Sequence, residues 1–224
     1  MVISRSGGGF GPPGTAPGDG RPSFTIGFTT NETPISEGGK FYHTANWWAN
    51  VRTGGNGTAW GLNGPNDAFD DAYAIISGTT GDYEMTVVVH RDDVNLNTAV
   101  VHEIELNCRF AETHSGLGIR GYETLMAFAG SADGIRWTHE PDGVVNFNGT
   151  TNTEGPGQSS SIENDDELKL TIIGNTRRIF HNGTLIATYV DSFYVDGELA
   201  IAYFTRPGGN SAHYCIKQLT VTPL

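Results

Sequence analysis

The sequence predicts an all-β protein built as a two-sheet sandwich, and three observations carry this prediction. Short stretches with alternating apolar residues, rich in β-branched and aromatic side chains, recur from residue 24 to the end of the chain. Turn-forming residues separate them: the chain holds 31 glycines and 10 prolines. No stretch has a convincing helical period. A length of 224 residues suits one large all-β domain.

The last part of the chain reads as a meander of strands joined by tight turns. Leu168–Ile173 alternates, Gly174-Asn175 turns the chain, and Asn182-Gly183 predicts a two-residue hairpin, because both central positions of that turn need a positive φ. The strands expected in this meander are 168–173, 177–181, 185–190, 198–204 and 213–221.

The strands expected before the meander follow the same signals. They are 24–28, 40–51, 72–76, 82–90, 100–110, 119–128 and 135–139. Residues 146–167 are rich in Gly, Ser, Thr and Asn, and we expect a long surface loop there.

Residues 1–22 form a Gly/Pro-rich arm ahead of the domain at 23–224. Half of the arm is glycine and proline, so alone it cannot bury enough surface to offset its ordering entropy. We expect such an arm to be held by a neighbouring subunit; the alternative is that it packs on its own domain.

Charge and composition exclude several classes of partner. The net charge of −12 argues against nucleic acid and anionic membrane, since both require a basic surface. Residues 1–22 lack the apolar core of an export signal, so we expect synthesis in a cytoplasm. Cys108 and Cys215 do not make a disulfide framework and are expected to be free thiols.

The meander also carries a family resemblance. The segments Leu168-Lys-Leu-Thr-Ile-Ile-Gly-Asn, His181-Asn-Gly-Thr-Leu-Ile-Ala, Val190-Asp-Ser and Gly197-Glu-Leu-Ala-Ile-Ala resemble the C-terminal half of concanavalin A-like lectin and glucanase domains, a superfamily that includes laminin-G-like modules. The resemblance covers roughly residues 23–224. It implies an antiparallel jelly roll, and it leaves function open because this fold hosts both binders and enzymes.

The strongest candidate site is the strand His102-Glu-Ile-Glu-Leu-Asn-Cys-Arg109. Strict alternation places Val100, His102, Ile104, Leu106, Cys108 and Phe110 on the core face, with His102 expected as a core histidine. The opposite face then carries Glu103, Glu105, Asn107 and Arg109. Four polar residues in a row on one face suggest the concave surface where the resembled family binds sugars.

A catalytic alternative follows from the same strand. Retaining glucanases of the resembled family carry Glu-Ile-Asp-Ile-x-Glu, with a nucleophile first and an acid/base last. Glu103 matches the nucleophile and Glu105 the intervening Asp, but Asn107 stands at the acid/base position and cannot donate a proton at a useful pKa. If the chain is an enzyme, Glu103 and Glu105 are its catalytic residues.

A structural alternative remains for these carboxylates, because Glu103 and Glu105 can pair with Arg109, Arg120 or Arg136 on adjacent strands. Aromatic rings could stack on sugars or pack in the core. The rings considered are Trp47, Trp48, Trp60, Tyr83, Tyr122 and Trp137. The expected carbohydrate-binding set is Glu103, Glu105, Asn107, Arg109, Arg120, Tyr122, Arg136 and Trp137.

No cofactor is expected, and metal ligands are weakly signalled. Asp67, Asp70 and Asp71 in one segment and Asn164 to Glu167 in another are rich in oxygen ligands, and the resemblance implies that a structural calcium ion is possible. Neither segment has EF-hand spacing, and solvated surface charge is the simpler interpretation.

These observations support three functions. The first is a non-catalytic lectin-like module with glycan binding or adhesion, carried on a larger assembly. The arm, the acidic domain and the absent signal fit a virion protein, such as a phage head-decoration or tail-associated subunit whose arm contacts capsid or tail proteins and whose domain lies at the virion surface. The second is a polysaccharide-cleaving hydrolase or lyase. The third is a purely structural module.

Overall fold

The chain is all-β throughout the part that the structure describes. A computed structural model describes residues 20–43, 49–61, 72–92, 100–112, 119–128, 134–143, 152–153, 158–159, 163–190, 197–207 and 213–224. Within these ranges there are seventeen strands and no helix, and therefore no helix that could cross a membrane.

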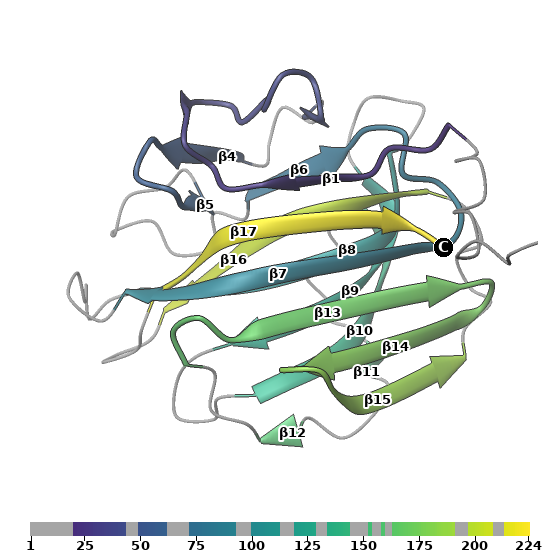
Figure 1. The fold of residues 1–224 in the computed structure, drawn as a ribbon. Helices are drawn as coiled ribbons and strands as arrows, with labels where there is room; N and C mark the ends of the chain where they lie inside the picture. The colour runs from purple at the N-terminus through teal and green to yellow at the C-terminus, as the bar shows by residue number, and fades with distance from the viewer. Residues whose placement is uncertain are drawn as a thin grey trace, which may run out of the picture.

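One sheet runs across the front of the view in Figure 1. Its strands pair antiparallel in the order β1 (Phe24–Ile26), β17 (His213–Pro223), β7 (Tyr83–Asp92), β13 (Glu167–Ile173), β14 (Thr176–His181) and β15 (Thr184–Val190). We refer to it as the first sheet. It contains most of the meander predicted from the sequence.

The second sheet lies behind the first in Figure 1, with β16 and β8 in its interior. Its strands pair antiparallel in the order β6 (Ala72–Ile76), β16 (Glu198–Pro207), β8 (Val100–Glu112), β9 (Ile119–Phe128) and β10 (Gly134–Gly143). Short strands extend its two ends. They are β2 (Asn31–Glu32), β3 (Phe41–Tyr42), β4 (Ala49–Gly54) and β5 (Ala59–Gly61) on the β6 side, and β11 (Asn152–Thr153) and β12 (Gln158–Ser159) beside β10.

The strands and their pairing differ from the sequence prediction in the following ways. The stretch predicted as one strand over 40–51 contains two strands, β3 and β4. Two short strands, β11 and β12, occur within the expected loop at 146–167. Two pairings are parallel, β4 with β6 and a single contact between β17 and β8. The short strands span too few residues to show an alternating pattern in the sequence. The parallel pairings join strands that are distant in the sequence, so no local pattern predicts them.

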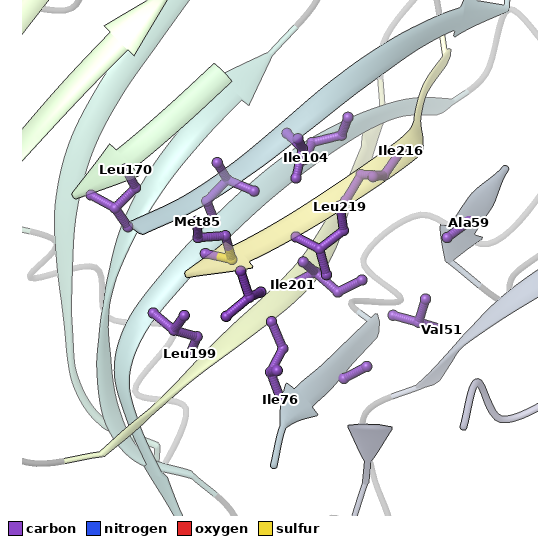
Figure 2. Packing of buried hydrophobic residues seen from close by; sticks show 14 of the residues in the cluster. Val51, Ala59, Ile76, Met85, Ile104, Leu170, Leu199, Ile201, Ile216 and Leu219 are labelled. Atoms are coloured by element: carbon purple, nitrogen blue, oxygen red, sulfur yellow. The ribbon is translucent and has the colours of Figure 1, made fainter. Parts of the chain in front are cut away.

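The core fills the space between the two sheets. Alternate residues of β7, β13 and β17 point into it from one side, and alternate residues of β16 and β8 from the other. Figure 2 shows Met85, Leu170 and Leu219 facing Ile104, Leu199 and Ile201 across this space. The predicted core positions Ile104, Leu106 and Cys108 are all buried there. Cys108 and Cys215 are both free thiols, as predicted, and both are buried.

Tyr203 ties three strands together inside the core. Its hydroxyl donates a hydrogen bond to the carbonyl of Ala59 on β5 and accepts one from the backbone N–H of Ile216 on β17, at 3.3 Å. Burial raises the pKa of this hydroxyl well above its usual range, and the nearby Cys215 adds to the effect. Tyr203 therefore stays neutral and acts as a fixed hydrogen-bonding group.

The hairpin between β14 and β15 has the turn that the sequence predicts. Asn182 and Gly183 have φ values of 49° and 75°. The Asn182 side chain also accepts a hydrogen bond from the backbone N–H of Glu167 at 2.8 Å, so the turn is fixed to the start of β13.

Asp166 organises the chain just before β13. Its carboxylate accepts hydrogen bonds from His181 at 2.8 Å, from the Asn182 amide at 2.7 Å and from the backbone N–H of Glu163 at 2.8 Å. Burial alone raises the pKa of this carboxyl, but the three hydrogen bonds and the charge of His181 outweigh burial. The pKa of Asp166 consequently lies below its usual value of 3.8.

Arg21 fixes the point at which the N-terminal segment joins the domain. Its guanidinium donates to the carbonyl oxygens of Asp82 and Leu224 at 2.7 and 2.9 Å, and it lies over the ring of Tyr83. Residues 1–19 of the predicted arm lie outside the described residues.

Asp166→Asn is expected to lower the free energy of unfolding by roughly 1–3 kcal/mol at pH 7, because it removes charge-assisted hydrogen bonds. A carboxyl whose folded pKa is lowered stabilises the fold above its unfolded pKa, and that contribution is lost as the pH falls through the folded pKa. Urea unfolding of both proteins at pH 7 and at pH 3 measures the difference. A difference that stays constant between the two pH values would contradict this role of Asp166.

Tyr203→Phe is expected to cost about 1–3 kcal/mol, because it leaves the buried Ala59 carbonyl and the Ile216 N–H without this partner. Thermal unfolding measures the cost, with Thr188→Val as a control that removes a hydroxyl from an exposed residue of β15. An equal effect of the two substitutions would show that the buried hydroxyl has no special role.

Candidate functional site

The candidate site is the face of the second sheet that points away from the core, which we call the site face. Two rows of cross-strand neighbours define it. One row contains Asn50, Tyr73, Ala202, Glu105, Met126 and Arg136. The other contains Tyr42, Ile75, Ala200, Asn107, Thr124 and Thr138.

The centre of the site face is shielded from solvent. Tyr73, Ile75, Ala200 and Ala202 are at most 1% exposed, yet none belongs to the core cluster between the sheets. The His43 ring lies against Tyr73, with 4.4 Å between ring centroids. The two alanines leave β16 without bulky side chains between the polar residues of β8 and the aromatic residues of β6.

Asn107 is the most informative residue of the site face. Its side chain is fully buried, although the sequence suggested an open surface, and neither its amide nitrogen nor its amide oxygen has a hydrogen-bond partner in the described structure. A buried polar group without a partner costs about 1–3 kcal/mol. An amide with two such groups therefore calls for an explanation, and a ligand that binds there is one.

The register places Glu105 beside Asn107 on the site face. Glu105 is opposite Ala202 on one side and Met126 on the other, two residues along β8 from Asn107. Glu103 is opposite Phe204. The backbone therefore brings these three predicted residues together in a line along β8.

A β-bulge interrupts the alternation beyond Cys108. Cys108 is opposite Glu123, but the next pair on β8 and β9 is Ala111 with Gly121, so β8 carries an extra residue. A bulge redirects the side chains that follow it. The strict alternation that assigned Arg109 to the site face and Phe110 to the core therefore does not extend through these two residues.

The remaining predicted residues lie on β9 and β10. Arg136 is in the row of Glu105, and Tyr122 lies two residues along β9 from Thr124, whereas Trp137 is opposite Leu125 in the row of the core residue Leu106. Arg120 lies at the far end of β9, before Gly121. Only the backbone of these residues is described.

The rings considered as sugar platforms fall into different environments. Tyr83 is fully buried and belongs to the core, so of the two alternatives for this ring the structure supports core packing. Trp60 is half-buried on β5, at the edge of the site face. Trp47 and Trp48 lie outside the described residues.

Sequence reasoning missed Arg52, the neighbour of Trp60. The two residues are opposite each other on β4 and β5, and the Arg52 guanidinium lies 5.4 Å from the centre of the indole ring. Arg52 and Trp60 are separated in the sequence and do not form part of a recognisable motif. The signal became visible only once the strands were paired.

Glu198 was also missed, and it has a structural role. It accepts hydrogen bonds from the Tyr42 hydroxyl and, at 2.5 Å, from the backbone N–H of Gly78. Thr79 adds a bond to the N–H of Leu199 at 2.9 Å. These contacts hold the turn after β6 against the beginning of β16.

The acidic segments considered for calcium have other partners or cannot be assessed. The Asp166 carboxylate is occupied by its three hydrogen bonds, and Asp165 pairs with Lys217 at 2.5 Å. Asp67, Asp70 and Asp71 lie outside the described residues. Within the described ranges no three His, Cys, Asp or Glu side chains gather in a way that could hold a metal ion.

Comparison with known proteins shows the fold. No protein-family model and no curated protein matches the sequence. Among solved structures, carbohydrate-binding module CBM66 of Bacillus subtilis is 13% identical with a TM-score of 0.51, and the match covers 78% of this chain and 94% of that one. The β-glucanase of Bacillus licheniformis is 12% identical with a TM-score of 0.54, over 92% of this chain and 100% of that one.

A third structure is a GlcNAcα1-4Gal-releasing endo-β-galactosidase of Clostridium perfringens. It is 10% identical with a TM-score of 0.58, and the match covers 95% of this chain but 66% of the enzyme. Two of these neighbours are enzymes and one is a binding module, so the likeness concerns architecture alone. The chain has the concanavalin A-like jelly-roll fold, as the sequence resemblance implied.

Proposed function

We propose that the protein is a non-catalytic carbohydrate-binding domain whose ligand lies on the site face. The observation that carries this proposal is the buried amide of Asn107, which has two unpaired polar groups at the centre of that face. The sugar-binding and sugar-cleaving proteins among the structural neighbours support the ligand class.

The residues near Asn107 match the chemistry of a sugar. Each sugar hydroxyl donates one hydrogen bond and accepts others, so one hydroxyl can accept from the Asn107 N–H while a neighbouring one donates to its carbonyl oxygen. The alternation along β8 predicts that the carboxylates of Glu103 and Glu105 add acceptors on the same face. Because the amide is buried in the free protein, the proposal requires that the side chains covering it turn aside when a ligand enters.

The same strand argues against hydrolysis. Glycoside cleavage needs a carboxylic acid that can protonate the leaving oxygen, and an amide at Asn107 cannot do so. Glu103 and Glu105 are i and i+2 on one strand, roughly 6.5–7 Å apart at Cα, and so approach a sugar from the same side. Binding without turnover is the activity that these residues fit.

The assembly context is a further part of the proposal. Residues 1–22 have the composition of an arm held by a neighbouring subunit, and Arg21 ties the base of that arm to Asp82 and Leu224. A virion protein, such as a head-decoration or tail-associated subunit that presents its domain to surface glycans, combines these properties.

Asn107→Leu is expected to change stability and binding in opposite directions. Leucine has the same branching at Cγ and leaves no buried polar group unpaired, so the free energy of unfolding should rise by about 1 kcal/mol or more. Glycan affinity should fall at least tenfold, because two hydrogen bonds to the sugar are lost. A glycan array identifies the ligand, and calorimetry with thermal unfolding measures the two effects.

Thr188→Leu on the first sheet serves as the control, because it adds an apolar side chain far from the site face. Loss of stability in Asn107→Leu would show that the amide has a structural role and would remove the main support for the proposal. Polysaccharide turnover that disappears in Glu103→Gln would contradict the non-catalytic assignment and favour the hydrolase alternative.

Deletion of residues 1–19 is expected to leave folding and glycan binding intact, because Arg21 and its contacts remain. Particles purified from the producing cells should contain the full chain but not the truncated one. Equal incorporation of both forms would exclude the arm as the attachment segment, whereas loss of folding in the truncated form would show that the arm belongs to the domain.

A further inference from the structure

We propose that Arg52 and Trp60 form a second subsite on the site face, which binds the carboxylate of an acidic sugar. This inference rests on the proposed function and adds a ligand class to it. The oligosaccharide would carry at least one uronic acid or other carboxylate-bearing unit at the β4–β5 end of the site.

The strand register places this pair on the same face as Asn107. Val51 and Ala59, the neighbours of Arg52 and Trp60 in sequence, are buried in the core, so Arg52 and Trp60 lie on the opposite side of their strands. Asn50, two residues before Arg52, is opposite Tyr73 in the row that contains Glu105. Arg52 and Trp60 therefore extend the site face beyond β6.

Both side chains have donors without acceptors. The Arg52 Nε and the Trp60 Nε1 are buried and have no hydrogen-bond partner within the described structure. Such buried N–H groups are rare in native proteins and call for an explanation. Because no residue in the described part of the chain supplies an acceptor to either donor, the proposal assigns that acceptor to a bound ligand.

The charge of Arg52 is also unmatched. The protein has 25 acidic and 13 Lys or Arg residues, so carboxylates are abundant. Lys169 and Lys217 pair with Glu84 and Asp165. No ion pair or side-chain hydrogen bond joins the Arg52 guanidinium to any residue in the described part of the chain, where its contact is the indole ring.

This arrangement fits a carboxylate better than a neutral hydroxyl. A guanidinium offers a planar fork of donors that binds a carboxylate through two parallel hydrogen bonds. The Trp60 ring holds the guanidinium through its π face, which reduces the freedom that Arg52 loses on binding. The half-buried position strengthens the ion pair relative to one in bulk water.

The charges along the site face orient such a ligand. Glu103 and Glu105 lie on β8, three strand spacings or roughly 14 Å from β4. Arg52 would attract a carboxylate-bearing sugar, and the predicted placement of Glu103 and Glu105 would repel it at the β8 end. The ligand would thus place neutral units near Asn107 and its acidic unit over the Arg52–Trp60 pair.

The test uses the full chain and a panel of acidic oligosaccharides, each paired with its carboxyl-reduced neutral counterpart. Calorimetry should give roughly tenfold tighter binding for the acidic member of a pair, since one charge-assisted bond of about 1.4 kcal/mol corresponds to that factor. Arg52→Gln should remove this preference and leave binding of the neutral member unchanged. Arg52→Lys, which keeps the charge but not the fork, should retain part of it.

Arg178→Gln is the matched control, because Arg178 is exposed on β14 of the first sheet and its substitution changes the net charge equally. Trp60→Phe keeps an aromatic ring and removes the N–H, so it should weaken the preference without abolishing it. Thermal unfolding confirms that each variant is folded.

The outcomes separate this inference from the proposed function. If neutral members bind and acidic members bind no better, the acidic subsite is wrong and the carbohydrate-binding function stands. The subsite is also wrong if Arg178→Gln has the same effect as Arg52→Gln, or if a sulfated counterpart gains as much affinity as the carboxylate. If no oligosaccharide in the panel binds, both proposals fall.

Discussion

The burial of β6, β16 and β8 on both faces is the constraint on which the rest of the structure depends. All five residues of β6 are buried. One side of the strand packs in the core, and the other belongs to the shielded centre of the site face. Ala200 and Ala202 are small enough to allow this on β16. An unpaired polar group is costly on a strand that is buried on both sides. The unpaired amide of Asn107 is therefore unusual among its apolar neighbours.

The central strands of the first sheet could be predicted from sequence because β7 and β13 largely alternate between buried and more exposed residues. Leu168, Leu170 and Ile172 alternate with more exposed residues on β13, and Asn182-Gly183 specifies its turn by a local backbone requirement. Neither signal needs information from elsewhere in the chain. The meander was therefore correct in both order and position.

The second sheet was less predictable because its features depend on partners that are distant in sequence. The fully apolar β6 has no alternation to reveal which face is which, and β11 and β12 are too short to show a period. The bulge after Cys108 breaks an alternation that the sequence alone continues through Arg109 and Phe110. The neighbours of Arg52 and Asn107 appear only once the register of β4, β5 and β8 is known.

The two proposals, attachment through residues 1–22 and glycan recognition, involve opposite ends of β6. At its C-terminal end the turn that follows is held by Glu198, and Pro22 lies against Gly78, beside the contacts that fix Arg21. Near its N-terminal end Tyr73 is opposite Asn50 on β4, the strand that also carries Arg52 opposite Trp60. If the domain is attached through residues 1–22, as proposed, the attachment lies beside one end of the site face and leaves the other end free. In that arrangement an extended oligosaccharide would meet the Arg52 end first, where the proposed subsite would receive its acidic unit.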